Sequence, residues 1–166
     1  MGDFEQLEMK EQLDMVELNC KALTAVTYMA IPHMVRNGRI IQLASAAAFG
    51  PQAHFAVYAA TKSYVLSFSR ALQEELIPRE IYVTAVCPGP VDTPFFDIAE
   101  KTGSTLAIKK YTMVEAERVV DRALKDSYQK RTLSVCSIPI QAFAVATKLL
   151  PHDVYLYLMK LLKKMQ

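Results

Sequence analysis

The sequence predicts an α/β fold in which helices cover a parallel sheet, and residues 1–166 are expected to form a single domain. Three short apolar runs, at residues 39–45, 81–87 and 131–138, have the length and composition of buried strands. Longer stretches with helical spacing of apolar residues precede, separate and follow these runs. Strands that alternate with helices in this way are joined by right-handed crossovers, which gives a doubly wound parallel sheet.

The first helix and strand are indicated by a change in the spacing of apolar residues. Between residues 13 and 34 they recur every three or four positions, which predicts a long amphipathic helix. Pro32 is expected to kink this helix, and Gly38 supplies a stop signal after it. The apolar strand at 39–45 follows, and residues 46–54 read as a loop.

The second helix and strand follow the same order. Helical periodicity returns over residues 55–76, and Pro78 ends it. The strand at 81–87 stops at Pro88 and Gly89, because proline cannot donate a hydrogen bond to a strand ladder.

The last part of the chain is predicted to be largely helical. Thr112 and Glu115 have the spacing of a capping box, which predicts a helix from there to about Tyr128. After the third strand, residues 139–166 read as two short amphipathic helices separated by Pro151.

Composition and charge narrow the class of protein. Apolar residues make up 52% of the chain and charged residues 22%, the balance of a soluble globular protein rather than a disordered one. Residues 1–100 carry 7 Lys and Arg against 12 Asp and Glu, whereas residues 101–166 carry 12 against 5. A solvated basic face is the favoured interpretation of the second half; a surface for phosphates, an acidic partner or a membrane is the alternative.

The cysteines and histidines give no sign of a disulfide or a metal site. The three cysteines are far apart in apolar surroundings, and the charged N-terminus is unlike a secretory signal, so reduced thiols in a cytoplasmic protein are expected. The three histidines have no ligand spacing, and no metal is expected.

A serine, a tyrosine and a lysine in one short stretch make a candidate for catalysis. Tyr58 and Lys62 are four residues apart, so they share one face of the predicted helix. An ammonium group near a phenol favours the phenolate and brings its pKa toward the working range. Ser45 ends a predicted parallel strand, where α/β sheets place reacting groups. Such a set suits carbonyl reduction or alcohol oxidation with a cofactor that supplies hydride; an accidental trio of polar residues is the alternative.

Four motifs carry a resemblance to the short-chain dehydrogenase/reductase family, whose members have a Rossmann-like fold. They are "ELNCKALT", "GRIIQLASAAA", "YAATK" and "VCPGPVDTPF", in the family's order and at its spacing. The resemblance implies that Tyr58 is the catalytic acid/base and that Ser45 orients the substrate. It also implies that Lys62 lowers the pKa of the tyrosine and binds the nicotinamide ribose, and that Asn19 holds a water of the proton relay to Lys62.

The same resemblance implies a nicotinamide cofactor. Val91 and Thr93 would contact the carboxamide after the Pro88-Gly89 turn, so the expected cofactor-binding residues are Tyr58, Lys62, Pro88, Gly89, Val91 and Thr93. The cofactor is expected to be NAD or NADP, with NADP slightly favoured. The substrate would be a small carbonyl or alcohol compound.

The sequence departs from the family at its beginning. The five glycines are at least twelve residues apart, so the glycine-rich turn that holds the cofactor pyrophosphate is absent from these residues. We therefore expect a partial Rossmann-like sheet without the N-terminal strands, and an incomplete cofactor site. The strand at 39–45 would then have an unpaired apolar edge, which favours self-association.

Two functions remain open from the sequence. The first is an NAD(P)-dependent oxidoreductase of the short-chain type in truncated form, and the alternative is a catalytically inactive fragment or an oligomerisation module. The helices at residues 9–35 and 55–77 resemble those that build subunit interfaces in the family, so a homo-oligomer is expected. No nucleic-acid partner is expected. The tail "HDVYLYLMKLLKKMQ" permits membrane-surface binding, but packing over the substrate pocket or between subunits is favoured.

Overall fold

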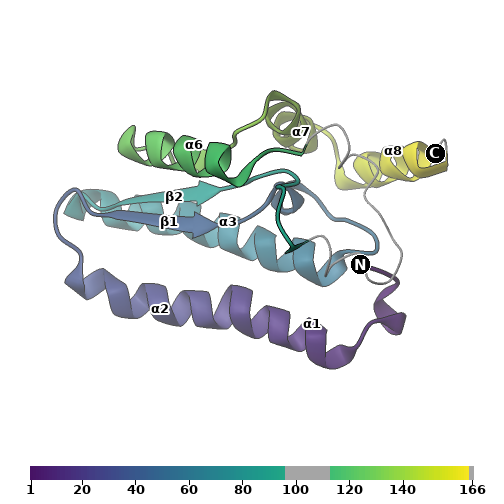
Figure 1. The fold of residues 1–166 in the computed structure, drawn as a ribbon, viewed down its shortest axis with the longest axis horizontal. Helices are drawn as coiled ribbons and strands as arrows, with labels where there is room; N and C mark the ends of the chain where they lie inside the picture. Colours follow the sequence, from purple (N-terminus) through teal and green to yellow (C-terminus); the bar gives the residue numbers. More distant parts are fainter. Residues whose placement is uncertain (96–112, 165–166) are drawn as a thin grey trace.

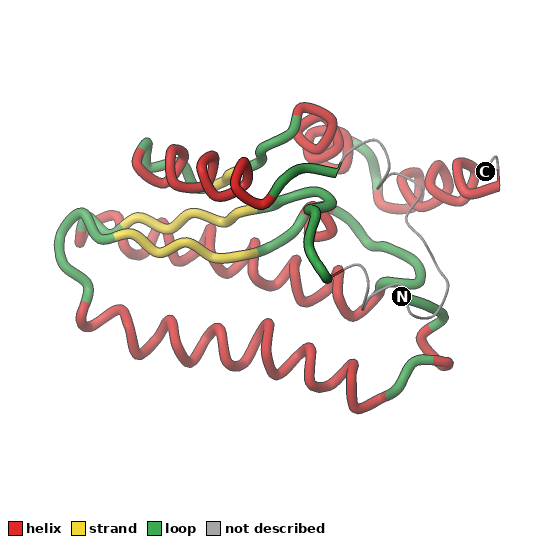
Figure 2. The backbone as a smooth tube through the Cα atoms, viewed as in Figure 1, coloured by secondary structure: helices red, strands yellow, loops and turns green. Residues whose placement is uncertain are grey.

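A three-stranded parallel sheet lies between two groups of helices in the computed structural model, which describes residues 1–95 and 113–164 (Figure 1). In chain order the main elements are α1 (Met9–Val16), α2 (Leu23–Ala30), β1 (Arg39–Leu43), α3 (Ala56–Leu76), β2 (Tyr82–Val86), α6 (Ala116–Tyr128), β3 (Leu133–Ser134), α7 (Ile138–Leu149) and α8 (His152–Lys164). Helices α1, α2 and α3 lie on one side of the sheet, and α6 lies on the other (Figures 1 and 2). The predicted α/β class with a parallel sheet is confirmed.

The strand order is β1-β2-β3, and both pairs are parallel. β1 pairs with β2 along its whole length, from Arg39 opposite Tyr82 to Leu43 opposite Val86. The third strand is much shorter than the predicted 131–138, because the chain leaves the sheet after Ser134 and enters α7 at Ile138. The strands are therefore held mainly by β2, which is buried along most of its length.

One part of the core forms where α3 packs against the face of the sheet that α1, α2 and α3 cover. Val65 of α3 packs with Ala44, just after β1, and with Cys87, just after β2. On the opposite face, Val119 and Ala123 of α6 pack against Val86. Helices α3 and α6 thus pack against the carboxyl ends of β1 and β2 from opposite faces of the sheet. This packing fixes the positions of the loops that follow these strands.

The predicted N-terminal helix is interrupted. A π-helical segment, Glu17–Ala22, separates α1 from α2, so one hydrogen-bonding pattern does not run through the whole helix. Pro32 lies in a 3-10 turn, Ile31–His33, that ends the helix rather than kinking it. The left-handed residue after this turn is Asn37, with φ of 60°, and not Gly38.

The C-terminal elements match the predicted division at Pro151. Helix α8 begins one residue later, at His152, and α6 begins at Ala116 with no side-chain cap from Glu115. Thr112 lies outside the described residues. In the part of the chain that the structure describes, no helix is long and apolar enough to cross a membrane.

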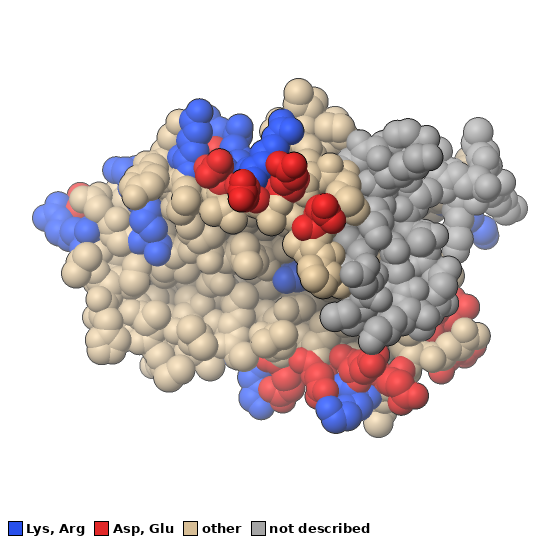
Figure 3. All heavy atoms as spheres, viewed as in Figure 1, with Lys and Arg blue, Asp and Glu red and all other residues tan. Residues whose placement is uncertain are grey.

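β1 is an edge strand among the described residues, as the sequence predicts. Its partner is β2 on one side, and the Leu43 side chain at its end is 64% exposed. Figure 3 shows that Lys, Arg, Asp and Glu gather over α6 and along α1, while the surface between them carries few charges. Exposed apolar residues on the α1–α2 side of the sheet include Leu18, Val26 and Tyr28.

Candidate active site

Ser45 lies two residues after the end of β1, where the sequence predicts the last residue of the strand, and it precedes a 3-10 turn, Ala46–Phe49. Its Oγ accepts a hydrogen bond of 3.2 Å from the backbone N–H of Ala47. The backbone N–H of Ala46 donates to the carbonyl oxygen of Pro88 at 2.8 Å, which ties this turn to the end of β2. The loops after the two central strands are therefore joined, and Ser45 is held at the carboxyl edge of the sheet.

Tyr58 and Lys62 lie on successive turns at the start of α3, on the side that faces Ser45. Ser45 lies near enough to the Tyr58 hydroxyl for its side chain to lower the pKa of the phenol. The Lys62 ammonium is 5.7 Å from the centre of the Tyr58 ring. Ser63 also donates a 3.1 Å hydrogen bond from its Oγ to the carbonyl oxygen of Ala48, which holds α3 against the turn after β1. The structure thus brings together the three residues that the sequence singled out.

The Tyr58 ring is enclosed by other aromatic rings. It stacks on Phe55 at a centroid distance of 4.3 Å, and Phe95 lies 5.5 Å away on a tilted plane. Burial is the larger influence on the phenol and raises its pKa, and the hydrogen bond with Ser45 offsets part of that rise. The neutral phenol is accordingly the favoured form of Tyr58 at neutral pH.

The described hydrogen bond of Lys62 leads to the sheet. Its ammonium donates a 2.9 Å hydrogen bond to the carbonyl oxygen of Leu43, the last residue of β1. Burial lowers the pKa of Lys62, while Cys87 and Cys20 act in the opposite direction. The pKa of Tyr58 is raised, because burial outweighs the opposite influence of the Ser45 side chain.

Asn19 is connected to Tyr58 by two hydrogen bonds through Thr61. It lies in the π-helical segment, and its Nδ2 donates to Thr61 Oγ1 at 3.1 Å. Thr61 Oγ1 in turn donates to the carbonyl oxygen of Tyr58 at 2.9 Å. The described contacts of Asn19 therefore lead to the Tyr58 backbone, whereas the resemblance implied a water-mediated link to Lys62. Thr61 was not singled out from the sequence, because a threonine inside a helix gives no catalytic signal.

The segment after β2 lies beside the same site. Pro88 and Gly89 end the strand as predicted, and Val91 forms a parallel bridge with Val114. Thr93 is exposed, and its Oγ1 is 3.5 Å from the carbonyl oxygen of Val91. The contact between Phe95 and Tyr58 places the end of this segment next to the phenol.

Cys87 lies between the two strand ends and was read from the sequence only as a buried thiol. Burial raises its pKa to about 12, despite a hydrogen bond from the backbone of Ser45 and the charge of Lys62. The thiol is therefore neutral at physiological pH and serves as packing beneath the site.

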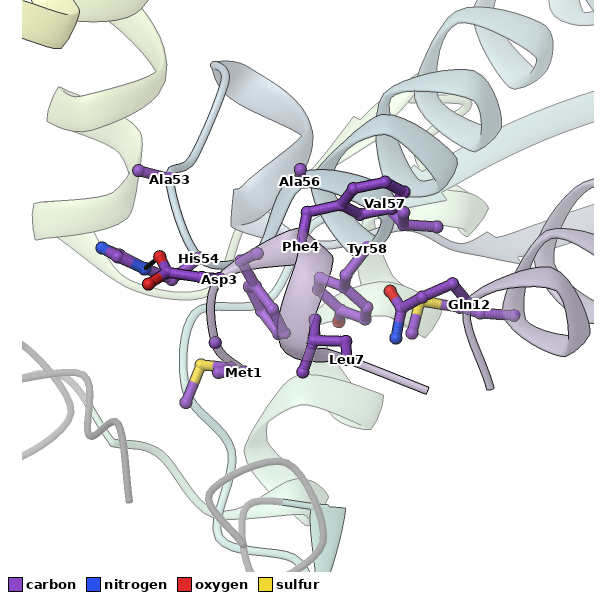
Figure 4. Close-up of a pocket in the computed structure, with 13 residues that line it drawn as sticks. Met1, Asp3, Phe4, Leu7, Gln12, Ala53, His54, Ala56, Val57 and Tyr58 are labelled. Carbon is purple, nitrogen blue, oxygen red and sulfur yellow. Dashed lines mark ion pairs between the residues drawn. The ribbon is translucent and has the colours of Figure 1, made fainter. Parts of the chain in front are cut away.

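A cavity of about 130 Å³ opens next to Tyr58, between the N-terminal segment and the start of α3 (Figure 4). Most of its lining is apolar and includes Phe4, Leu7 and Val57. An ion pair of 2.8 Å between Asp3 and His54, drawn as a dashed line in Figure 4, fastens the N-terminal segment to the loop before α3. The sequence did not predict that residues near Met1 line this cavity, because no motif in them indicates a contact with the start of α3.

Metal ligation has no support in the described residues. Within 1–95 and 113–164 no group of three or more His, Cys, Asp or Glu side chains could hold an ion.

Comparisons with known proteins identify the family of the chain. The family model for the short chain dehydrogenases matches residues 1–103. An uncharacterized oxidoreductase of Staphylococcus epidermidis is 31% identical over 134 residues, which cover 79% of this chain and 55% of that protein. A probable NADP-dependent dehydrogenase of Haemophilus influenzae is 34% identical over 119 residues, or 70% of this chain and 47% of that protein. The chain thus spans about half the length of the curated relatives it matches.

A solved structure shares the fold over nearly the whole chain. The short-chain dehydrogenase from Sphingobium yanoikuyae in complex with NADPH superposes with a TM-score of 0.73 at 26% identity, covering 96% of this chain and 60% of that one. The family match, the parallel sheet and the placement of Ser45, Tyr58 and Lys62 at its carboxyl edge lead to one conclusion: the chain belongs to the short-chain dehydrogenase family.

Proposed function

We propose that these residues form the catalytic part of an NAD(P)-dependent oxidoreductase that interconverts a carbonyl and an alcohol on a small molecule. The observation that carries the proposal is the grouping of three side chains: Ser45 lies beside the Tyr58 hydroxyl, and Lys62 is one helical turn away with its ammonium 5.7 Å from the centre of the Tyr58 ring. All three lie at the carboxyl edge of a parallel sheet, where such folds bind ligands and react.

Each side chain has a role that its surroundings support. Ser45 Oγ accepts from Ala47, which leaves its own O–H free to point at Tyr58 or at a substrate oxygen. A donor at that position stabilises the negative charge that develops on a carbonyl oxygen as it is reduced. Tyr58 would transfer its proton to that oxygen. Since burial raises the pKa of Tyr58, the group is protonated at neutral pH and suited to act as the acid.

The residues present fit the nicotinamide end of a cofactor. The Lys62 ammonium is buried enough for its pKa to fall, and it bonds a backbone carbonyl that a ribose hydroxyl can replace as acceptor. Pro88, Gly89, Val91 and Thr93 follow the neighbouring strand and are proposed to contact the carboxamide. The cofactor supplies the hydride. NADP is favoured over NAD, since a solved relative binds NADPH and a curated relative is named as NADP-dependent.

Asn19 is proposed to act on Tyr58 through Thr61. The two hydrogen bonds, 3.1 Å and 2.9 Å, run from the Asn19 amide to Thr61 and on to the Tyr58 carbonyl. These hydrogen bonds hold the first turn of α3 against the π-helical segment. We propose that they thereby position the Tyr58 side chain in the site.

An interaction module without catalytic activity is the second candidate. It is favoured by the exposed apolar side chains on α1 and α2 and by the absence of a glycine-rich pyrophosphate turn from the sequence. Either function is compatible with a homo-oligomer, which we also propose.

The experiment measures NADPH binding and turnover. Titration with NADPH, followed by cofactor fluorescence, should show saturable binding, and ketones or aldehydes should be reduced. Tyr58→Phe should lower turnover by about 10²–10⁴-fold while binding persists, since the change removes only the acid. Tyr64→Phe on the same helix is the matched control, because Tyr64 hydrogen-bonds Thr24 away from the site and should leave turnover unchanged. Absence of saturable NADPH binding would favour the interaction module.

A further inference from the structure

The C-terminal helix α8 carries an apolar stripe that the rest of the described chain leaves exposed. Val154, Tyr157, Leu158 and Leu161 are 44%, 63%, 42% and 40% exposed. Their spacing of i, i+3, i+4 and i+7 places all four along one face of a helix. Side chains of this size gain most from leaving water, so a continuous stripe of them is suited to a contact.

The helix is held to the body by a different face. Tyr155 is 4% exposed and packs 6.0 Å from the ring of Phe143. A Cβ added to Gly50 would lie 3.1 Å from the same tyrosine ring, so α8 rests directly on the loop after β1. Because successive residues of a helix are turned by about 100°, Tyr155 and the stripe point in different directions. The body therefore holds α8 without covering the stripe.

The charges around the stripe are mostly positive. From residue 148 to the end the sequence has four lysines, at positions 148, 160, 163 and 164, against the single carboxylate of Asp153. Lys160 is exposed and lies within the helix beside the stripe. Basic residues beside an apolar stripe are attracted to an anionic surface, while the apolar residues enter it.

We propose that α8 is an interfacial helix that docks its stripe of Val154, Tyr157, Leu158 and Leu161 onto an anionic membrane surface. The helix has 13 residues, about 20 Å of length, which is too short to cross a hydrocarbon core of about 30 Å. Tyr157 has the amphipathic ring that is typical of the headgroup region. Contact between two copies through the stripe alone is disfavoured, because a stable interface uses about 20–30 residues a side and the stripe has four.

The position of α8 gives the proposal a consequence for the enzyme. The helix rests on the loop that leads from Ser45 to α3, at the carboxyl edge of the sheet. A membrane-bound α8 would hold that edge near the lipid surface. This inference depends on the exposed stripe and its charges alone, so it stands or falls independently of the proposed catalytic function.

The experiment is co-sedimentation of the chain with vesicles. The wild-type chain should bind phosphatidylcholine vesicles that contain about one third phosphatidylglycerol, and bind pure phosphatidylcholine at least about tenfold more weakly. Raising the salt from about 0.1 M to about 1 M should weaken binding, since the screening length falls from about 10 Å to about 3 Å. The double variant Tyr157→Glu with Leu161→Glu should lose binding by at least about tenfold.

Matched controls keep the result specific to α8. Val26→Glu with Tyr28→Glu changes two exposed apolar residues on α2 and should leave vesicle binding unchanged. Lys148→Glu with Lys160→Glu keeps the stripe and should lose the preference for anionic vesicles, which provides a second test if the first double variant folds poorly by circular dichroism. No binding to the anionic vesicles, equal loss in the α2 control, or a wild-type dimer that the Tyr157 and Leu161 changes dissociate without vesicle binding would each overturn the proposal.

Discussion

Opposing influences set the protonation of Tyr58. Burial raises the pKa of the phenol, and the hydrogen bond with Ser45 lowers it. The nearest ammonium, on Lys62, bonds the carbonyl oxygen of Leu43 instead of the phenol oxygen. The pKa of the proposed acid, Tyr58, is therefore shifted by burial and by the Ser45 hydroxyl. Lys62 contacts the end of β1.

Removing the Ser45 hydroxyl should raise the pKa of Tyr58 further. Ser45→Ala takes away the only cause that favours the phenolate, so its titration should move to higher pH. The measurement is ultraviolet difference absorbance during alkaline titration, with the Tyr58→Phe variant subtracted to isolate this tyrosine from the other seven. An unchanged or lowered pKa in Ser45→Ala would contradict the hydrogen bond.

The same shift has a consequence for stability against pH. The folded pKa of Tyr58 lies above the unfolded value, which is about 10. Its contribution is therefore fully present below about pH 10 and is lost as the pH rises through the folded pKa. Tyr58→Phe should show a shallower loss of stability above about pH 10 than the wild type.

At the scale of elements, α8 depends on one side chain for its position. Tyr155 is the buried residue of this helix among those described, and it contacts Phe143 and the Gly50 loop. The rest of α8 lies on the outside of the body, as Figures 1 and 2 show.

Tyr155→Ala should release α8 from the body. Truncating a buried aromatic ring costs about 3–5 kcal/mol of packing, and here the loss falls on one helix. The amides of α8 should exchange with deuterium faster, and proteases should cut near Pro151, while α3 keeps its protection. Tyr157→Ala is the control, because its ring is exposed and the change should alter stability by less than about 0.5 kcal/mol. Equal protection of α8 in both variants would show that other contacts hold it.

At the scale of the whole molecule, the sheet ends on a strand that is suited to further pairing. β1 is joined to β2 on one side, and its other side carries no strand among the described residues. Unpaired strand edges accept other chains unless charges or bulges protect them. The short sheet and the sparsely charged surface beside it (Figure 3) are the reasons that we expect an oligomer.

The chain should self-associate in a concentration-dependent way through this edge. Leu43→Lys places a charge at the exposed end of β1 and should reduce the fraction of oligomer in sedimentation velocity runs at matched concentrations. Val35→Lys, which changes a somewhat more exposed apolar residue after α2, should have a smaller effect. If both variants reduce association equally, the contact is general and apolar rather than at the strand edge.

The sequence by itself determined the α/β class, the positions of β1, β2 and α3, and the trio of Ser45, Tyr58 and Lys62. It could do so because these features depend on local spacing: apolar periodicity, prolines at strand ends and residues four apart on a helix. The length of β3 and the π-helical break at Glu17–Ala22 were not predictable, since both are set by how the chain packs after the local pattern ends.

Only the tertiary structure decided which contacts the candidate site residues make. Contacts across more than forty residues join Asn19 to Thr61, and the N-terminal segment folds back to Tyr58 through Asp3 and His54. It also gave the pKa of Tyr58 its direction, because burial raises that pKa and depends on every neighbour of the ring. Spacing along the chain indicates the candidate reacting groups. Their environment depends on contacts with residues that are distant in the sequence, and no motif predicts these contacts.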